Sequence, residues 1–112
     1  MTGLDVEKSS SLEHCMGFFF AWDPNKAHTN RQNHGVTFEE ASTVFGDTLS
    51  LTIYDEEHSD EEDRLIIIGM SLQHRLLVVV HTDRGDTIRI ISARRATAHE
   101  RNTYERNAEQ YG

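Results

Sequence analysis

The chain has only one cysteine and one proline among its 112 residues. A single cysteine, Cys15, cannot form an internal disulfide, and this is typical of proteins from a reducing cytoplasm. The low proline content argues against a disordered linker protein. The longest apolar runs, at 65–70 and 76–80, are too short to cross a bilayer, and no signal-peptide pattern opens the chain. We therefore expect a cytoplasmic protein that does not associate with membranes.

Several motifs of well-known enzyme sites are also missing. The seven histidines show no metal-ligand spacing such as His-x-x-x-His, and one cysteine is too few for a structural zinc site. The sequence contains no glycine-rich phosphate loop, serine-nucleophile elbow or dinucleotide-binding fingerprint. We expect neither a cofactor nor a bound metal.

Charge is distributed unevenly along the chain. The formal net charge is −8, but residues 55–63 contain seven acids and no Lys or Arg, whereas residues 64–112 contain eight arginines and five acids. Clustered like charges resist packing, so segment 55–63 is predicted to be a solvated loop. The acidic total argues against strong non-specific nucleic-acid binding. The acidic total does not exclude a local anion site in the C-terminal half, because salt screens interactions between charges more than about 10 Å apart.

The N-terminal half predicts one strand and two helices. Residues 1–16 lack periodicity and are expected to form a disordered extension, followed by a single domain over 17–112. Residues 17–22 are aromatic-rich and predict a strand. Asp23 as N-cap and Pro24 at the first position begin a helix that ends at Gly35, a residue suited to a left-handed C-cap.

The second helix is predicted by a capping box. Thr37 would accept a hydrogen bond from a helix-start amide, and Glu40 would reach back to the start. The helix extends to about residue 45, with Phe38, Ala41 and Phe45 on one face directed to the core.

The C-terminal half predicts four strands and a final helix. Apolar patterns mark strands at 49–54, 64–71, 75–82 and 87–93, and Gly85 suits the turn before the last of them. The continuous apolar character of the middle two strands predicts that both of their faces are covered. A second capping box, Thr97 with Glu100, begins a helix to about residue 109. The order is β-α-α-β-β-β-β-α, an α+β domain with an antiparallel sheet packed against helices.

The strand at 87–93 and the helix start after it carry arginines on different elements. Strict alternation would direct Ile88, Ile90 and Ser92 to one face and Arg89, Ile91 and Ala93 to the other. Further arginines follow at the strand end and in the first helical turn, at positions 94, 95 and 101. Cations on several elements can converge on one spot, as a phosphate-binding site requires.

Three separated blocks of the sequence resemble the BrnT family, and they occur in the family's order. The resemblance covers roughly residues 18–106, and one departure is Asn33, where the family usually has a lysine before the His-Gly pair. The blocks are Trp22-Asp23-Pro24-Asn25-Lys26-Ala27 with Asn30, then His34-Gly35-Val36-Thr37-Phe38-Glu39-Glu40-Ala41, and Arg89-Ile90-Ile91-Ser92-Ala93-Arg94-Arg95-Ala96.

The resemblance implies a toxin of a type II toxin–antitoxin pair with a RelE-like fold. It implies a ribonuclease that uses no metal, inhibits translation and arrests growth. It also implies a partner, a BrnA-like antitoxin, that sequesters the toxin and binds promoter DNA as a joint complex.

This chemistry suggests roles for the C-terminal cations. Arginine stays protonated, and its planar fork can bind two phosphate oxygens, so we expect Arg89 and Arg94 to be phosphate clamps supported by Arg64. His81, near the end of a neighbouring strand, could act as acid or base near neutral pH. The expected RNA-binding residues are Lys26, His34, Arg95 and Arg101.

Each of these residues also has a purely structural interpretation. Arg89 could pair with Asp86 or a helix carboxylate, Arg94 could belong to a solvated strand end, and His81 could be a satisfied sheet residue. The alternative function is a non-catalytic protein-binding module that acts only within a complex. A DNA-binding regulator acting alone is disfavoured by the negative charge and the lack of a helix-turn-helix pattern.

Overall fold

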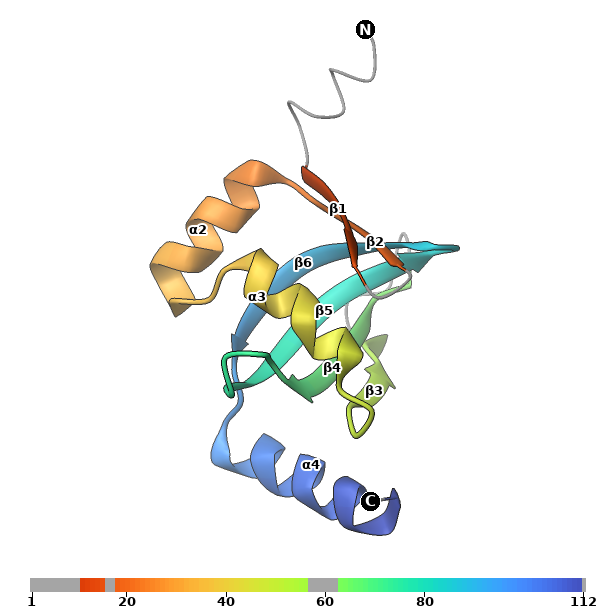
Figure 1. Cartoon of the computed structure of the whole chain (residues 1–112). Coiled ribbons are helices and arrows are strands. Elements are labelled where there is room, and N and C mark those ends of the chain that lie inside the picture. The colour runs from red at the N-terminus through yellow and green to blue at the C-terminus, as the bar shows by residue number, and fades with distance from the viewer. Residues whose placement is uncertain (1–10, 16–17, 57–62, 112) are drawn as a thin grey trace, which may run out of the picture.

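The computed structural model describes residues 11–15, 18–56 and 63–111 as a six-stranded sheet with helices on both faces (Figure 1). The α+β class and the predicted order of elements from residue 18 onward are confirmed. The elements are β1 (Ser11–Cys15), β2 (Phe18–Trp22), α2 (Pro24–His34), α3 (Phe38–Thr43), the 3-10 helix η1 (Val44–Gly46), β3 (Leu51–Tyr54), β4 (Leu65–Met70), β5 (Leu76–Arg84), β6 (Thr87–Arg95) and α4 (Ala98–Tyr111).

The sheet order is β1-β2-β6-β5-β4-β3. The predicted antiparallel meander of β4, β5 and β6 is confirmed, and β1–β2 and β3–β4 are antiparallel as well. The pairing of β2 with β6 is parallel, which corrects the expectation of a wholly antiparallel sheet. The reason is topological. After β2 the chain passes through α2 and α3 to the far edge of the sheet, where β3 lies, so the strand that pairs with β2 is β6 and not β3.

Of the two predictions about irregular segments, one is corrected and the other falls mostly outside the described residues. Ser11–Cys15 forms strand β1 against β2, so the expectation of disorder is corrected for these five residues, while residues 1–10 lie outside the described part. The segment has no periodicity of its own, and it becomes a strand because β2 offers a free edge. The acidic segment predicted as a loop lies outside the described residues except for Asp55, Glu56 and Asp63.

The ends of α2 follow the prediction. The Asp23 carboxylate accepts a hydrogen bond from the Asn25 amide at 2.9 Å, Pro24 occupies the first turn, and Gly35 caps the other end with a φ of 69°. This φ lies in the left-handed region, where a side chain would be strained and glycine is not.

The capping box of α3 is only half formed. The Thr37 hydroxyl accepts a hydrogen bond from the Glu40 amide at 3.0 Å, but the Glu40 side chain turns away from the helix start. Its Oε2 accepts from Arg75 Nε at 2.9 Å and from the Ser71 hydroxyl at 2.8 Å, and its Oε1 accepts from Arg75 Nη2. Arg75 Nη2 also donates to the Gly35 carbonyl. This partly buried ion pair therefore joins α3 and the end of α2 to the β4–β5 turn.

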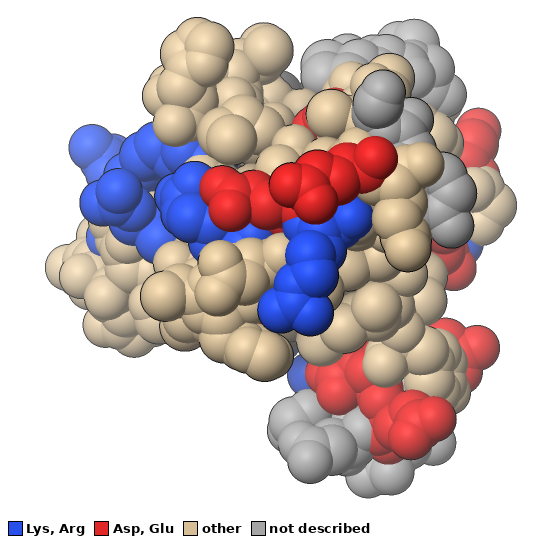
Figure 2. Space-filling model, turned by 90° about the horizontal axis from the view of Figure 1, so that it is seen from below, with Lys and Arg blue, Asp and Glu red and all other residues tan. Residues whose placement is uncertain are grey.

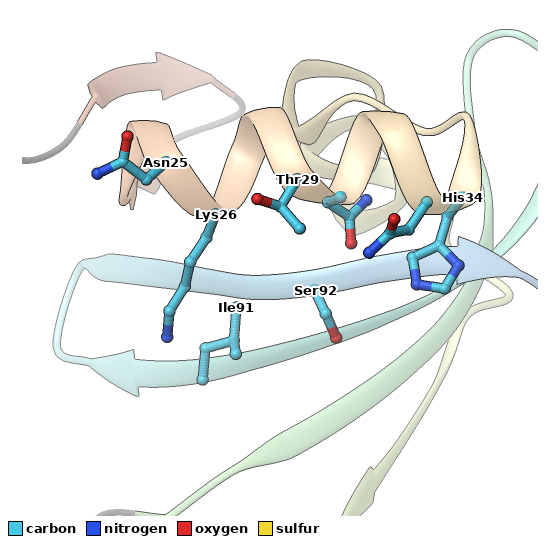
Figure 3. A pocket seen from close by; sticks show the side chains of 8 residues that line it. Asn25, Lys26, Thr29, His34, Ile91 and Ser92 are labelled. Atoms are coloured by element: carbon cyan, nitrogen blue, oxygen red, sulfur yellow. The ribbon is translucent and has the colours of Figure 1, made fainter.

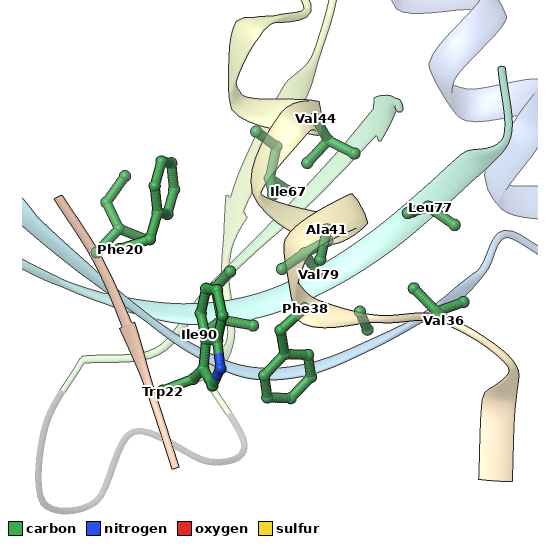
Figure 4. Packing of buried hydrophobic residues seen from close by; sticks show 12 residues of the cluster. Phe20, Trp22, Val36, Phe38, Ala41, Val44, Ile67, Leu77, Val79 and Ile90 are labelled. Atoms are coloured by element: carbon green, nitrogen blue, oxygen red, sulfur yellow. The ribbon is translucent and has the colours of Figure 1, made fainter. Parts of the chain in front are cut away.

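Hydrophobic residues pack on both faces of the sheet, which confirms the prediction for β4 and β5. On the face covered by α3 and η1, the α3 face, aromatic and aliphatic side chains form the larger cluster (Figure 4). Helix α4 covers part of the opposite face, the α4 face, where Tyr104 packs among Ile68, Leu76 and Val78. The predicted core residues of the second helix are confirmed: Phe38 and Ala41 are buried in the larger cluster, and Phe45 packs against it.

Strand β6 contains a bulge. Val80 pairs with Ser92, but the next residue of β5, His81, pairs with Ile90. Ile91 is therefore one extra residue on β6, and such an insertion resets which side chains face which side.

The bulge makes the predicted strict alternation wrong beyond Ile90. Ala93 is buried in the cluster on the α3 face, together with Ile88 and Ile90, and so does not share the face of Arg89. A single extra residue cannot be read from an apolar pattern, because the residues on both sides of it still alternate locally.

Asn30 joins α2 to the edge of β6. Beyond Arg89, no strand of the described chain pairs with that edge, because β2 stays in register only as far as Ala21. The Asn30 side chain takes the place of a strand: its Nδ2 donates to the Ala93 carbonyl at 2.8 Å, and its Oδ1 accepts from the Ala93 amide at 3.0 Å. The same Nδ2 donates to the Val36 carbonyl at 2.9 Å. This buried amide fixes the distance between helix and strand.

Candidate functional site

The register of the strands places two of the predicted arginines on the α4 face. Arg89 pairs with Thr82, which neighbours His81 in the strand, and His81 packs against Phe45 on the α3 face. Successive side chains of a strand point to opposite faces, so Thr82 and Arg89 point to the α4 face. Arg64 directly precedes Leu65, the partner of His81, so it lies beside Thr82 and also points to the α4 face.

A groove lies between α2 and β6 (Figure 3). It has a volume of about 310 Å³, and side chains of Lys26, Thr29 and His34 extend into it from the helix. Ile91 and Ser92, at the bulge, form its other wall. The groove therefore brings together Lys26 and His34, two of the predicted RNA-binding residues, beside the strand that carries Arg89. The other lining residues are Asn25, Asn30 and Asn33.

Arg94 is held by α4. Its Nη1 and Nη2 donate to the two Glu100 oxygens at 2.8 and 2.7 Å. The predicted capping box is complete here, because Glu100 accepts from the Thr97 amide while the Thr97 hydroxyl accepts from the Glu100 amide. The hydrogen bonds from Arg94 lower the pKa of Glu100 to about 2. The sequence did not predict this ion pair, which leaves Arg94 less available to a substrate than Arg89.

We predict that Glu100→Gln lowers the free energy of unfolding by about 1 kcal/mol at pH 7, a discounted value because the Arg94 side chain is partly exposed. Folding lowers the Glu100 pKa from its ordinary 4.5, so the stabilisation is complete above pH 4.5 and is lost as the pH falls toward 2. Urea unfolding of both proteins at pH 7 and pH 3 measures the difference. An equal difference at both pH values would show that the ion pair adds no stability.

His81 lies in the interior. Its ring packs edge-on against Phe45 at 4.8 Å between centroids, its Nδ1 lies 3.3 Å from the Val79 carbonyl oxygen, and only 3% of the residue is exposed. Burial lowers the pKa of His81 below its usual range, although Asp83 acts against this. In this conformation the ring cannot contact a substrate, so the structure places His81 apart from the other predicted residues.

The remaining cations lie near α4 and at the end of β6. Arg95 and Arg101 are both exposed. Figure 2 shows Lys and Arg side chains beside a band of Asp and Glu side chains, so this side of the molecule is not a continuous basic surface. Long-range attraction to any polyanion is therefore weak, and recognition depends on local contacts.

A comparison with known protein families identifies the family of this chain. The sequence model described as "Ribonuclease toxin, BrnT, of type II toxin-antitoxin system" matches residues 22–100. The chain belongs to the BrnT family. It is thus a member of a family of ribonuclease toxins, and the type II pairing implies an antitoxin partner. None of the curated proteins matches the chain.

The crystal structure of the BrnT ribonuclease toxin of Brucella abortus has the same fold. The TM-score is 0.54 at 24% sequence identity, over 68% of this chain and 92% of that one. This likeness supports the α+β architecture, and the RelE-like label stays a prediction. No helix among the described residues of this BrnT chain is long and apolar enough to span a membrane.

Sequence reasoning missed three polar residues of this BrnT chain that the structure makes prominent. Asn30 was noted only as one residue of the blocks that resemble the family, and no role was predicted for Arg75. Thr82, between His81 and Asp83, was treated as a strand end. The sequence held a signal for each of the last two: Arg75 directly precedes an apolar run, and Thr82 lies two positions after a run of three valines, on the side of the strand that alternates with His81.

Proposed function

We propose that this chain is a metal-independent endoribonuclease that inhibits translation and is neutralised by a BrnA-like antitoxin. The observation that supports it best is the groove between α2 and β6, because it places Lys26 and His34 next to the strand that presents Arg89. A cation, a titratable ring and a guanidinium are the groups that RNA cleavage requires.

The reaction uses the RNA's own nucleophile. A ribose 2′-oxygen attacks the adjacent phosphorus, the bond from phosphorus to the 5′-oxygen breaks, and a 2′,3′-cyclic phosphate and a 5′-hydroxyl are formed. The 2′-hydroxyl gives its proton to a base, and the leaving 5′-oxygen receives one from an acid. No metal-activated water is needed, since water does not take part in this step.

The structure changes which residues we assign to these tasks. Arg89 and Lys26 are proposed to stabilise the charge on the phosphoryl oxygens, with Arg64 in support. The acid–base role passes from the buried His81 to His34, which is exposed and lines the groove. Arg94, predicted to be a phosphate clamp, is now proposed to have a positioning role through Glu100. Arg95 and Arg101 are proposed to contact more distant phosphates.

The partner and the location belong to the same proposal. A BrnA-like antitoxin would sequester the chain in the cytoplasm, and promoter DNA would be bound only through the antitoxin.

Incubation of purified protein with total RNA in excess EDTA tests the activity. We expect fragments that end in 2′,3′-cyclic phosphate, detected because a 3′-phosphatase acts on them only after acid opening. Cleavage that requires added magnesium would contradict metal independence. If naked RNA is stable, the same protein added to a translation extract decides whether ribosomes present the substrate, and uninhibited translation would reject the activity.

The non-catalytic binding module is the second candidate. It is favoured by one pair of observations: His81 is buried and Arg94 is bound to Glu100, so two of the four residues predicted to be catalytic are engaged in the fold. This alternative predicts that a partner binds with unchanged affinity when Arg89 is replaced, and that no RNA is cut under any condition.

A further inference from the structure

The side chain of Thr82 is buried without a hydrogen-bond partner. The residue is 2% exposed, and its hydroxyl is the one buried side-chain group of the described residues that makes no hydrogen bond. Removing a hydroxyl from water without a new partner is unfavourable, and buried polar groups in proteins are nearly always paired. Such an exception calls for an explanation other than stability.

Packing alone does not explain the threonine. Valine has the same shape and an equal preference for strands, and β5 already contains valines at Val78, Val79 and Val80. A valine at position 82 would fill the same space without the cost of an unpaired hydroxyl. The fold therefore gives no reason for the hydroxyl at this position.

Arginines surround Thr82 on the α4 face. Arg89 is its cross-strand partner on β6, and Arg64 lies beside it at the start of β4. Arg84 is two residues further along β5 and so points to the same face. Side chains directly opposite one another on paired strands have Cβ atoms about 5 Å apart, so the hydroxyl and the three guanidinium groups can reach one small ligand.

The acid nearest to Thr82 in the strand does not neutralise this group. Asp83 points to the α3 face, where its charge acts on His81. On the α4 face, Asp55 lies beside Arg64, because its amide donates a hydrogen bond to the Arg64 carbonyl across β3 and β4. Three arginines therefore face one carboxylate around the hydroxyl, and this excess of positive charge favours an anion.

We propose that Thr82, Arg64, Arg84 and Arg89 form a binding site for one phosphate of the RNA backbone. The Thr82 hydroxyl donates a hydrogen bond to a phosphate oxygen, and the guanidinium groups bind the other oxygens. The long arginine side chains move aside to admit the phosphate, and the bound phosphate supplies the partner that the hydroxyl lacks. This inference rests on the proposed function for its ligand: the phosphate is the one that Arg89 and Arg64 are proposed to bind, and the inference adds Thr82 and Arg84 to its contacts.

The test compares Thr82→Val with the wild type in binding to a 2′-O-methyl RNA oligonucleotide. This probe carries the phosphates but has no free 2′-hydroxyl, so it binds without being cut. We expect affinity, measured by fluorescence anisotropy, to fall by about tenfold or more, because a hydrogen bond to a charged group is lost. We also expect the melting temperature to rise by a few degrees, because the unpaired hydroxyl is gone.

Two further variants serve as controls. Thr82→Ser keeps the hydroxyl and should retain affinity within about threefold. Thr52→Val removes an exposed hydroxyl from β3 and should leave both affinity and melting temperature unchanged.

Three results would overturn the phosphate site: no binding of the probe by the wild type, wild-type affinity in Thr82→Val, or a melting temperature of that variant below the wild type. Cleavage of unmodified RNA is scored separately. Loss of affinity in Thr82→Val, with no cleavage by the wild type of naked RNA and no inhibition of a translation extract, would keep the phosphate site and reject the endoribonuclease.

Discussion

Replacing Arg89 by alanine is expected to lower the rate of RNA cleavage by about a hundredfold or more, the usual effect of removing one charged or dipolar group that stabilises a transition state. Arg89 points from β6 to the α4 face, beside the groove that holds Lys26 and His34. Negative charge on the phosphoryl oxygens grows as the 2′-oxygen attacks, and a guanidinium beside them stabilises that charge more than it stabilises the bound RNA.

The fold should tolerate the change. Within the described residues, no hydrogen bond or ion pair of the Arg89 side chain connects it to the rest of the protein, so the melting temperature should stay close to that of the wild type. Arg89→Lys keeps the charge but not the two-pronged geometry, and we expect it to recover only part of the rate. Arg106→Ala on α4, an exposed arginine away from the groove, is the matched control and should cleave normally.

Initial rates with a defined RNA substrate, together with thermal unfolding of each variant, measure these effects. Wild-type cleavage by Arg89→Ala would remove Arg89 from the site. Loss of cleavage together with a large drop in melting temperature would instead indicate a structural role.

Replacing Asn30 by alanine is expected to destabilise the protein by about 3–5 kcal/mol, because the Ala93 amide, the Ala93 carbonyl and the Val36 carbonyl lose their partner in a buried place. For a domain of this size the melting temperature should fall by about 10–25 °C. Asn30 is 6% exposed, so water cannot replace the amide without a rearrangement of α2 against β6.

The neighbouring Asn33→Ala provides the comparison for stability, since Asn33 is exposed on the same helix and should change the melting temperature little. Asn30→Asp keeps the acceptor for the Ala93 amide but loses both donated hydrogen bonds, so it should be destabilised as well. Thermal and urea unfolding of the three variants and the wild type measure these differences in stability. If Asn30→Ala unfolds within about 1 kcal/mol of the wild type, the amide does not fix α2 to the strand.

These expectations separate two groups within the sequence blocks that resemble the BrnT family. Trp22, Val36, Phe38 and Ala41 are buried in the larger hydrophobic cluster, and the side chains of Asn30 and Glu40 are committed to hydrogen bonds that connect elements. Lys26 and His34 are the ionisable members of the same blocks that line the groove. Most of the resemblance therefore reflects the fold, and only a few positions bear on the chemistry.

The sequence by itself determined the local structure. Side chains adjacent in the chain decide the helix starts at Asp23 and Thr97 and the left-handed end at Gly35, because each depends on hydrogen bonds or backbone freedom within a few residues. The continuous apolar runs of β4 and β5 likewise predict that both faces of these strands are covered. The same local signals could not show that Glu40 would abandon its own helix start, since its partner Arg75 is 35 positions away.

Only the tertiary structure decided which candidate residues share a site. The bulge at Ile91 resets the facing of β6, and the parallel pairing of β2 with β6 leaves the strand edge that Asn30 completes and the groove adjoins. His81 is buried and cannot contact a substrate, and the Arg94 guanidinium is bound by the Glu100 carboxylate. Residue type and spacing show what a side chain can do, but its face, its neighbours and its access to solvent arise from contacts between distant segments.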